Sequence, residues 1–257
     1  MAAADRPPRA RLLLLGASNV RRMLPELVRE ARWRLGAPLD VVASHGSGRS
    51  YLGPSSLLFR GLDRIAPDAF WSFEQSQDAP ACALVADPGN DLAYGARPEV
   101  VAASIERLVA RLVRGSRCVV IAGPPLASLA SLGPLRFQAA RALLFPTRRI
   151  DRARVKADAE ELDARLRAIA QAYHSTHVAP RAEWYGIDPI HVRLRARGEA
   201  ARTLLEALGP RRGAEPGSLE LGALSRLKPQ SFSWFGIQAS WPQPSARLAD
   251  GTRVSWF

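Results

Sequence analysis

The sequence contains very little lysine: Lys156 and Lys228 are the only two in 257 residues. Arginine supplies most of the positive charge, and 36 Lys plus Arg against 24 Asp plus Glu give a net charge of +12. The arginines are spread along the chain and do not gather in one arm or stripe, which is typical of a biased composition. We therefore expect no nucleic-acid partner, although a positive field favours acidic substrates.

Cysteine is equally scarce, since Cys82 and Cys118 are the only two and each lies in a short apolar run. No metal-ligand spacing surrounds them, so the sequence predicts neither a metal site nor a disulfide framework.

Long apolar runs are lacking too. The four leucines at 12–15 are too few for a signal peptide, and no run approaches the roughly 18 residues of a membrane span. We expect a cytoplasmic protein without a transmembrane segment; its oligomeric state is left open.

Hydrophobic residues make up 47% of the chain, enough for the core of one large domain. Short apolar runs at 12–15, 39–43, 83–86, 118–122 and 176–179 predict buried strands. Helical spacing between them predicts helices at 25–35 with Pro25 as the first residue, at 98–112, at 155–173 and at 194–208. This alternation predicts an α/β fold: a three-layer α/β/α sandwich around a central parallel sheet, spanning residues 1–210.

The composition changes after residue 210, where Gly, Pro, Ser and aromatic residues become frequent. We interpret 211–257 as a short C-terminal β-rich extension packed on the core, with a hairpin turn at Ala249–Thr252. Its aromatic side chains either cover the core or form a dimer contact, or else they provide a surface for sugar or lipid.

Small and polar residues follow the predicted strands where each of them ends. Ser18 follows the first strand, Gly48 the second and Asn90 the third, and Asp188 and His191 follow the fifth. An ester hydrolase that uses serine needs a hydroxyl at a sharp turn, a histidine to take its proton, a carboxylate to orient that histidine, and donors for the oxyanion. Because parallel strands all end at one edge of a sheet, we expect these residues to lie close together and to supply the groups that such a hydrolase needs.

Four short sequence blocks around these residues resemble, in their order and spacing, the SGNH (GDSL-like) hydrolase superfamily. In that superfamily Ser, Gly, Asn and His come from four successive blocks of the sequence. The resemblance covers residues 10–208 and implies the flavodoxin-like SGNH hydrolase fold. It also implies Ser18 as nucleophile, His191 as base and Asp188 as its partner, with an oxyanion hole from the Ser18 and Gly48 N–H groups and Asn90. A small-molecule ester would be the substrate, and no cofactor is required. The blocks are Leu15-Gly16-Ala17-Ser18-Asn19, Ser47-Gly48, Gly89-Asn90-Asp91 and Asp188-Pro189-Ile190-His191.

The chain departs from the family pattern at three positions. Ala17 stands where the family usually has Asp, Pro88 where Gly is common, and Val192 where Pro often follows the histidine. Gly46 also competes with Gly48 for the second block, and we favour Gly48 from its distance to the strand.

Other interpretations stay open. Ser18 could be a helix cap, and Asn90 with Asp91 a turn cap. His45, in the second-block loop, is a hypothesis for substrate contact. The apolar residues Leu132, Leu135, Phe137, Leu143, Leu144 and Phe145 form either core or an acyl pocket.

Three other functions also remain open. The same site could serve an acyltransferase that passes the acyl group to a sugar or another alcohol. The chain could be a non-catalytic binding protein with the same fold, as Ala17, Pro88 and the C-terminal extension suggest. Polyanion binding through the arginine surplus is the remaining alternative.

Overall fold

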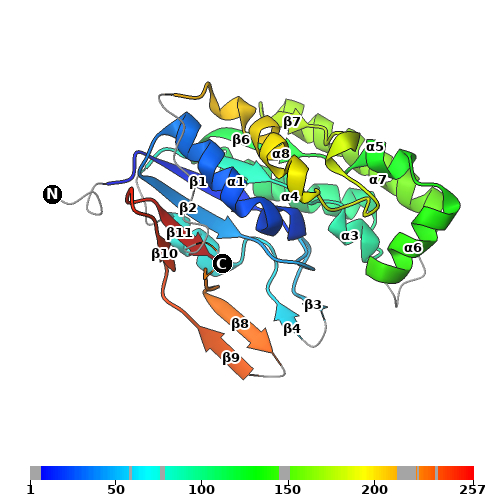
Figure 1. Cartoon of the computed structure of the whole chain (residues 1–257), viewed down its shortest axis with the longest axis horizontal. Coiled ribbons are helices and arrows are strands. Elements are labelled where there is room, and N and C mark those ends of the chain that lie inside the picture. Colours follow the sequence, from blue (N-terminus) through cyan, green and yellow to red (C-terminus); the bar gives the residue numbers. More distant parts are fainter. Residues whose placement is uncertain are drawn as a thin grey trace.

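A mostly parallel sheet forms the centre of the structure, a computed structural model that describes residues 7–57, 60–75, 79–144, 151–212, 224, 226–234 and 237–257. Its seven strands lie in the order β10-β11-β2-β1-β5-β6-β7 (Figure 1). The strands are β1 (Ala10–Leu15), β2 (Leu39–Ser44), β5 (Ala81–Val85), β6 (Ser116–Ala122), β7 (Thr176–Val178), β10 (Ala246–Arg247) and β11 (Arg253–Trp256).

The five strands that the sequence predicts run in the spatial order β2-β1-β5-β6-β7, and all their pairings are parallel. This is the flavodoxin-like order, in which the chain changes direction across the sheet beside β1. Ligands of such sheets bind at that switch point, outside the carboxyl ends of the strands. The residues that follow β1 and β5 therefore occupy the position where a site is expected.

Helices cover both faces of the sheet, and alternation along the strands explains why. Leu12 and Leu14 pack in one core with α1 and α8, whereas Leu13 and Leu15 pack in the other with α2, α4 and α7. The helices are α1 (Ser18–Leu35), α2 (Asp68–Gln75), α3 (Asn90–Ala93), α4 (Pro98–Leu112), α5 (Leu126–Ala130), α6 (Pro134–Leu144), α7 (Arg152–Ala172) and α8 (Arg197–Leu204), with 3-10 turns at Ala182–Trp184, Leu194–Ala196 and Glu206–Leu208.

The predicted three-layer α/β/α sandwich is confirmed. The helix predicted for 155–173 spans Arg152–Ala172, and two other predicted helices differ more strongly. Helix α1 begins at Ser18, so Pro25 lies inside it and is not its first residue. The single helix predicted for 194–208 is broken into a 3-10 turn, α8 and a second 3-10 turn, ending at Gly209 with a φ of 111°. No helix in the described ranges is long and apolar enough to cross a membrane.

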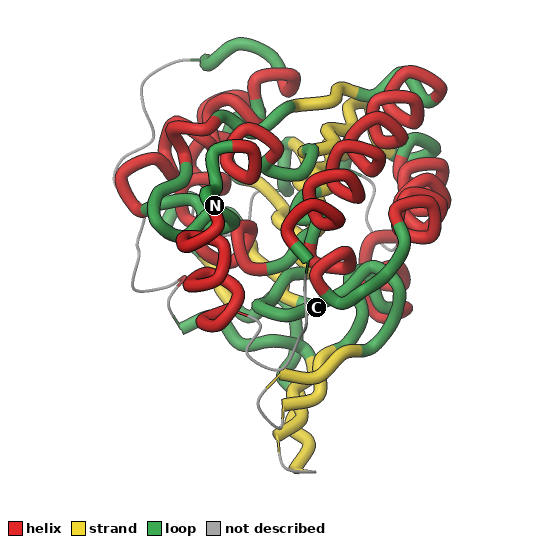
Figure 2. The backbone as a smooth tube through the Cα atoms, turned by 90° about the vertical axis from the view of Figure 1, so that its right-hand side faces the viewer, coloured by secondary structure: helices red, strands yellow, loops and turns green. Residues whose placement is uncertain are grey.

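A small antiparallel sheet projects from the body of the molecule (Figures 1 and 2). It joins β3 (Ser55–Leu57) and β4 (Arg60–Leu62), which follow β2, to β8 (Ser231–Trp234) and β9 (Ile237–Ser240) near the C-terminal end. Further along, β11 pairs in parallel with β2 and so extends the central sheet. The segment 211–257 thus contributes strands to both sheets.

Candidate active site

Ser18 lies directly after β1, as the first residue of α1, and only 5% of its surface is exposed. The chain turns sharply there at Gly16. A Cβ atom on Gly16 would lie 2.4 Å from Val20 Cγ2, so only glycine fits between the strand and the first turn of the helix. The serine hydroxyl is therefore held at the N-terminal, positive end of an 18-residue helix.

The Asp87 carboxylate caps that helix from the neighbouring strand end. One oxygen, Oδ2, accepts hydrogen bonds from the N–H groups of Ala17 at 2.8 Å, Asn19 at 3.0 Å and Val20 at 3.3 Å. The Ser18 N–H is the one omitted from this set, and it has no hydrogen-bond partner among the residues that the structure describes. An anionic cap thus fixes the helix start and leaves one N–H group free.

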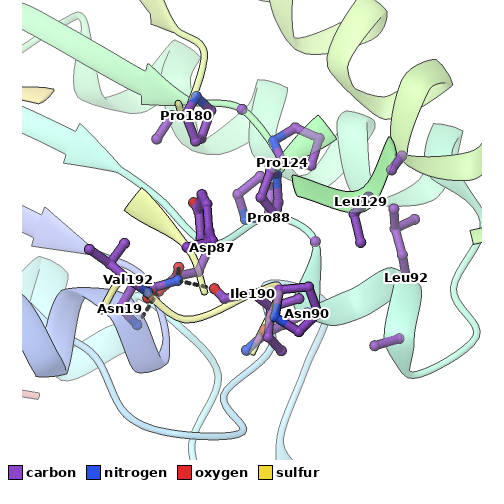
Figure 3. A pocket seen from close by; sticks show the side chains of 18 of the residues that line it. Asn19, Asp87, Pro88, Asn90, Leu92, Pro124, Leu129, Pro180, Ile190 and Val192 are labelled. Carbon is purple, nitrogen blue, oxygen red and sulfur yellow. Dashed lines mark hydrogen bonds between the residues drawn. The ribbon is translucent and has the colours of Figure 1, made fainter. Parts of the chain in front are cut away.

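Asn19 connects the Ser18 turn to the segment that carries His191 (Figure 3). Its amide nitrogen donates to Asp87 Oδ1 at 2.8 Å and to the carbonyl oxygen of Ile190 at 2.9 Å. Its amide oxygen accepts from the Val192 N–H at 2.9 Å. The residues on both sides of His191 are therefore tied to the residue that follows Ser18.

Asp188 and His191 form a close pair. His191 Nδ1 lies 2.6 Å from Asp188 Oδ2, while Asp188 Oδ1 accepts from the N–H groups of Ile190 and His191. Burial by itself would raise the pKa of Asp188, but the hydrogen bond with His191 and the two N–H groups outweigh it and hold that pKa below its usual range. A carboxylate therefore orients the imidazole and leaves Nε2 to face other groups.

Ser18 and His191 make no hydrogen bond with each other in the described chain, although Asn19 holds their segments together. Catalytic hydrogen bonds are often long before substrate binds and tighten in the complex. The structure thus brings the four predicted blocks to one edge of the sheet and pairs Asp188 with His191.

Gly48 lies in the loop after β2 with a φ of 85°, a conformation that favours glycine. Its carbonyl oxygen accepts hydrogen bonds from Ser55 Oγ at 2.8 Å and Tyr94 Oη at 3.0 Å. Its own N–H has no partner within the described ranges. Gly46, the rival for this block, lines a cavity between the small sheet and Trp256.

A buried carboxylate joins the second and third blocks. Asp91 Oδ2 accepts from the Tyr51 N–H at 3.0 Å, and Asp91 Oδ1 accepts from the Ser50 hydroxyl. Burial raises the pKa of Asp91 above its usual value, and these two hydrogen bonds oppose the rise without cancelling it. Tyr51 Oη in turn donates to the carbonyl oxygen of Ala86 at 2.6 Å. The Gly48 loop and Asn90 are thereby fixed relative to each other.

Asn90 is the first residue of α3, and its side chain lies at an apolar pocket (Figure 3). Among the described residues its side-chain amide has no hydrogen-bond partner. The pocket lies among the ends of β5 and β6, α5, α6 and the segment before His191. Residues that line it include Leu92, Pro124, Leu129, Leu132, Phe137 and Ile190.

Two of the apolar residues noted in the sequence, Leu132 and Phe137, line this pocket and also belong to the core beneath it. Leu135 does neither, because 87% of its surface is exposed. Phe145 and the side chains of Leu143 and Leu144 lie outside the described residues.

His45 lies away from this pocket. It is 2% exposed, stacks on Trp256 and lines a second cavity. Asp87 and Asn19 are the site residues that the sequence interpretation missed. Asp87 lies two residues before the third block, and Asn19 is the last residue of the first block, so their positions beside Asn90 and Ser18 were the signal that could have found them. In the described part of the chain, no group of three His, Cys, Asp or Glu side chains is arranged to hold a metal ion.

No protein-family model matches the chain, and a comparison with curated proteins found no match either. Solved structures do match. A catalytic mutant of Axe2, an acetylxylan esterase from Geobacillus stearothermophilus, is 13% identical with a TM-score of 0.50, covering 81% of this chain and 99% of its own. Another Axe2 mutant, described as an acetyl-xylooligosaccharide esterase, reaches 0.53 at the same identity and coverage.

A carbohydrate acetylesterase family member from Sinorhizobium meliloti is 17% identical with a TM-score of 0.46, covering 77% of this chain and 95% of its own. Identities this low establish a fold and nothing finer. The chain shares the fold of the Axe2 esterase structures, and the fold that the sequence resemblance implied is confirmed.

Proposed function

We propose that the protein is a serine-dependent hydrolase of carboxylic esters. The observation that carries the proposal is the Asn19 side chain, which ties the Ser18 turn to the main chain on both sides of His191. Two further observations support the proposal: Asp188 Oδ2 lies 2.6 Å from His191 Nδ1, and the Ser18 turn follows β1 at the switch point of the sheet. Nucleophile, base and orienting carboxylate are the three parts that acyl transfer through serine requires.

In the proposed reaction, Ser18 Oγ attacks the acyl carbonyl carbon while His191 Nε2 takes the hydroxyl proton. Asp188 stabilises the imidazolium that forms. The tetrahedral oxyanion accepts hydrogen bonds from the N–H groups of Ser18 and Gly48 and from the amide of Asn90, all of which lack another partner in the described chain. The alcohol leaves with the proton from His191. Water then repeats the sequence on the acyl-enzyme and releases the acid.

The apolar pocket beside Asn90 supports an acyl group with a hydrocarbon chain. Leu129, Leu132 and Phe137 supply apolar surface there, and Asn90 lies at the same pocket. An extended acyl chain gains about 0.8 kcal/mol for each buried CH₂ group. We therefore propose a substrate with an acyl chain longer than acetyl.

The alternative of a non-catalytic binding protein rested on Ala17, Pro88 and the C-terminal extension. The Asp87 carboxylate, which accepts the Ala17 N–H at 2.8 Å, weakens that argument because a carboxylate still organises the turn. Transfer of the acyl group to an alcohol instead of water needs the same residues. Addition of a suitable alcohol distinguishes the two reactions, since transfer replaces acid by a new ester.

The test is hydrolysis of p-nitrophenyl esters from acetate to palmitate by the purified protein, with Ser18→Ala as the matched control. We expect hydrolysis by the wild type only, with a maximum beyond acetate. An activated phosphonate should label the wild type once per chain and leave Ser18→Ala unlabelled. Equal hydrolysis by both proteins, or absence of both activity and labelling, would contradict the proposal.

A further inference from the structure

Two segments that enclose the apolar pocket also reach the molecular surface. One is α6, at the edge of the molecule (Figure 1), and the other is the loop from Trp184 to Arg193. A hydrogen bond from the Arg193 N–H to the Trp184 carbonyl oxygen, 2.9 Å long, closes this loop at its base. Arg136 of α6 donates to the carbonyl oxygen of Gly186 in the loop at 2.8 Å. We call these two segments and the 3-10 turn Leu194–Ala196 the outer rim of the pocket.

The inner side of the outer rim is apolar and faces the pocket. Phe137 of α6 lines the pocket together with Pro189 and Ile190 of the loop, and Phe137 is 8% exposed. Leu135 lies two residues before Phe137, and side chains two apart on a helix point to nearly opposite sides. Leu135 therefore points away from the pocket, and 87% of its surface is exposed. Helix α6 thus carries apolar side chains on both its inner and its outer side.

Exposed apolar side chains gather on the outer side of this rim. Leu135 and Ile187 are each 87% exposed and Leu194 is 73% exposed, the highest values for large apolar side chains among the described residues. The next, Ile237 at 68%, belongs to β9 of the small sheet. A single exposed apolar side chain is common on a protein surface and needs no explanation. Three of them on neighbouring segments around one pocket are typical of an interaction surface.

The charge of the outer rim indicates the kind of partner. Residues 134–144 and 184–196 include one acidic residue other than Glu in position to bind, Asp188, which His191 already holds at 2.6 Å. Basic groups attract anionic lipid headgroups while apolar side chains enter the interface, so this mixture favours a membrane surface. A second copy of the chain would bring its own arginines against these, and like charges repel. The arginines of the rim are Arg136, Arg141, Arg193 and Arg195.

We propose that the outer rim docks on an anionic phospholipid surface, and that the pocket behind it receives the acyl chain of an ester held in the bilayer. In the docked state, Leu135 and Ile187 enter the interface and Arg195 contacts lipid phosphates. The docking requires no catalysis, whereas the choice of a lipid ester as substrate rests on the proposed function.

Docking is tested with the full-length Ser18→Ala protein, so that no ester is consumed. Cosedimentation is measured with vesicles of phosphatidylcholine alone and with vesicles of equal parts phosphatidylcholine and phosphatidylglycerol. We expect saturable binding to the phosphatidylglycerol vesicles, about tenfold tighter than to phosphatidylcholine alone and weaker as salt is added. Equal binding to both kinds of vesicle, or binding to neither, would overturn the proposal.

Substitutions in the same protein locate the docking surface. Leu135→Ser combined with Ile187→Ser removes two exposed apolar side chains and should weaken vesicle binding about tenfold. Ile237→Ser, on the small sheet, is the matched control and should bind like the parent. Arg195→Gln should weaken binding about fivefold, whereas Arg114→Gln, between α4 and β6 at the opposite edge of the sheet, should not. Equal effects of rim and control substitutions would overturn the proposal, as would a dimer that the rim substitutions dissociate and that binds no vesicle.

Catalysis separates this inference from the proposed function. With Ser18 restored, the Leu135→Ser and Ile187→Ser double variant should hydrolyse soluble p-nitrophenyl butyrate like the wild type. It should hydrolyse p-nitrophenyl palmitate held in phosphatidylglycerol vesicles about tenfold more slowly than the wild type. Equal rates of the two proteins on the vesicle-held ester would overturn the docking inference alone. Vesicle binding by a wild-type protein that hydrolyses no ester would overturn the proposed function and leave the docking intact.

Discussion

Asn19 Nδ2 donates a hydrogen bond to Asp87 Oδ1 at 2.8 Å, and so joins the ends of β1 and β5 at the switch point of the sheet. The other oxygen of Asp87 accepts from three N–H groups at the start of α1. Because Asn19 also holds the main chain around His191, these two side chains join the Ser18 turn to the His191 segment.

Replacement of Asp87 tests its role as the cap of α1. Asp87 has a φ of 60°, which asparagine also tolerates, so Asp87→Asn removes the charge with little change in backbone preference. We expect a loss of about 1 kcal/mol in the free energy of unfolding, measured by urea denaturation, because the negative charge at the N-terminus of α1 is lost, and a fall in kcat for a p-nitrophenyl ester. Wild-type stability and kcat in this variant would show that the cap is dispensable.

Replacement of Asn19 tests the link between the serine and histidine segments. Asn19→Ala loses the hydrogen bonds to Asp87, Ile190 and Val192, so His191 is no longer fixed relative to Ser18. We expect kcat to fall about 100-fold while KM changes little, because misplacement of reacting groups slows the chemical step. Ser131→Ala, which removes only a local bond to Ser128, is the control and should leave both constants unchanged.

The oxyanion donors are tested by Asn90→Ala. Its amide is proposed to act only on the charge that develops in the transition state, so kcat should fall about 100- to 1,000-fold at nearly constant KM. Steady-state kinetics across the ester series provides the measurement. A rise in KM with kcat preserved would instead assign Asn90 to ordinary substrate binding.

The strand ends could be predicted from the sequence because each is marked locally. Apolar runs of four or five residues give way to Ser18, Gly48 or Asn90, and parallel strands bring their carboxyl ends to one edge. The pairing of Asp188 with His191 was also accessible, since a three-residue separation fits within one turn.

Contacts between distant segments could not be predicted in this way. The Asp87 cap joins residues 70 positions apart, and it explains why α1 begins at Ser18 rather than at Pro25. Strand β11 likewise pairs with β2, although more than 200 residues separate the two in the sequence. Nothing in either segment specifies this pairing. The sequence of a short strand does not identify the strand with which it pairs.

The last prediction concerns acid stability through Asp163, which is 6% exposed and lies 3.0 Å from His177 Nε2. Burial would raise the pKa of Asp163, but the hydrogen bonds from His177 and Arg167 outweigh it and lower the pKa below 3.8. A carboxyl group whose pKa is lower in the folded state stabilises that state above the unfolded pKa. This contribution is fully present above about pH 4 and is lost as the pH falls through the folded pKa.

Asp163→Asn should therefore lower the free energy of unfolding at pH 7 by about 1–3 kcal/mol, because it weakens the hydrogen bonds of the buried carboxylate with His177 and Arg167. The difference from the wild type should shrink as the pH is lowered below about 4, which urea denaturation at several pH values measures. Asp68→Asn removes a carboxylate that is 93% exposed and paired with Arg64, so it should change stability by less than about 1 kcal/mol. Equal losses in the two variants would refute the assignment, because burial of the Asp163 pair is what distinguishes them.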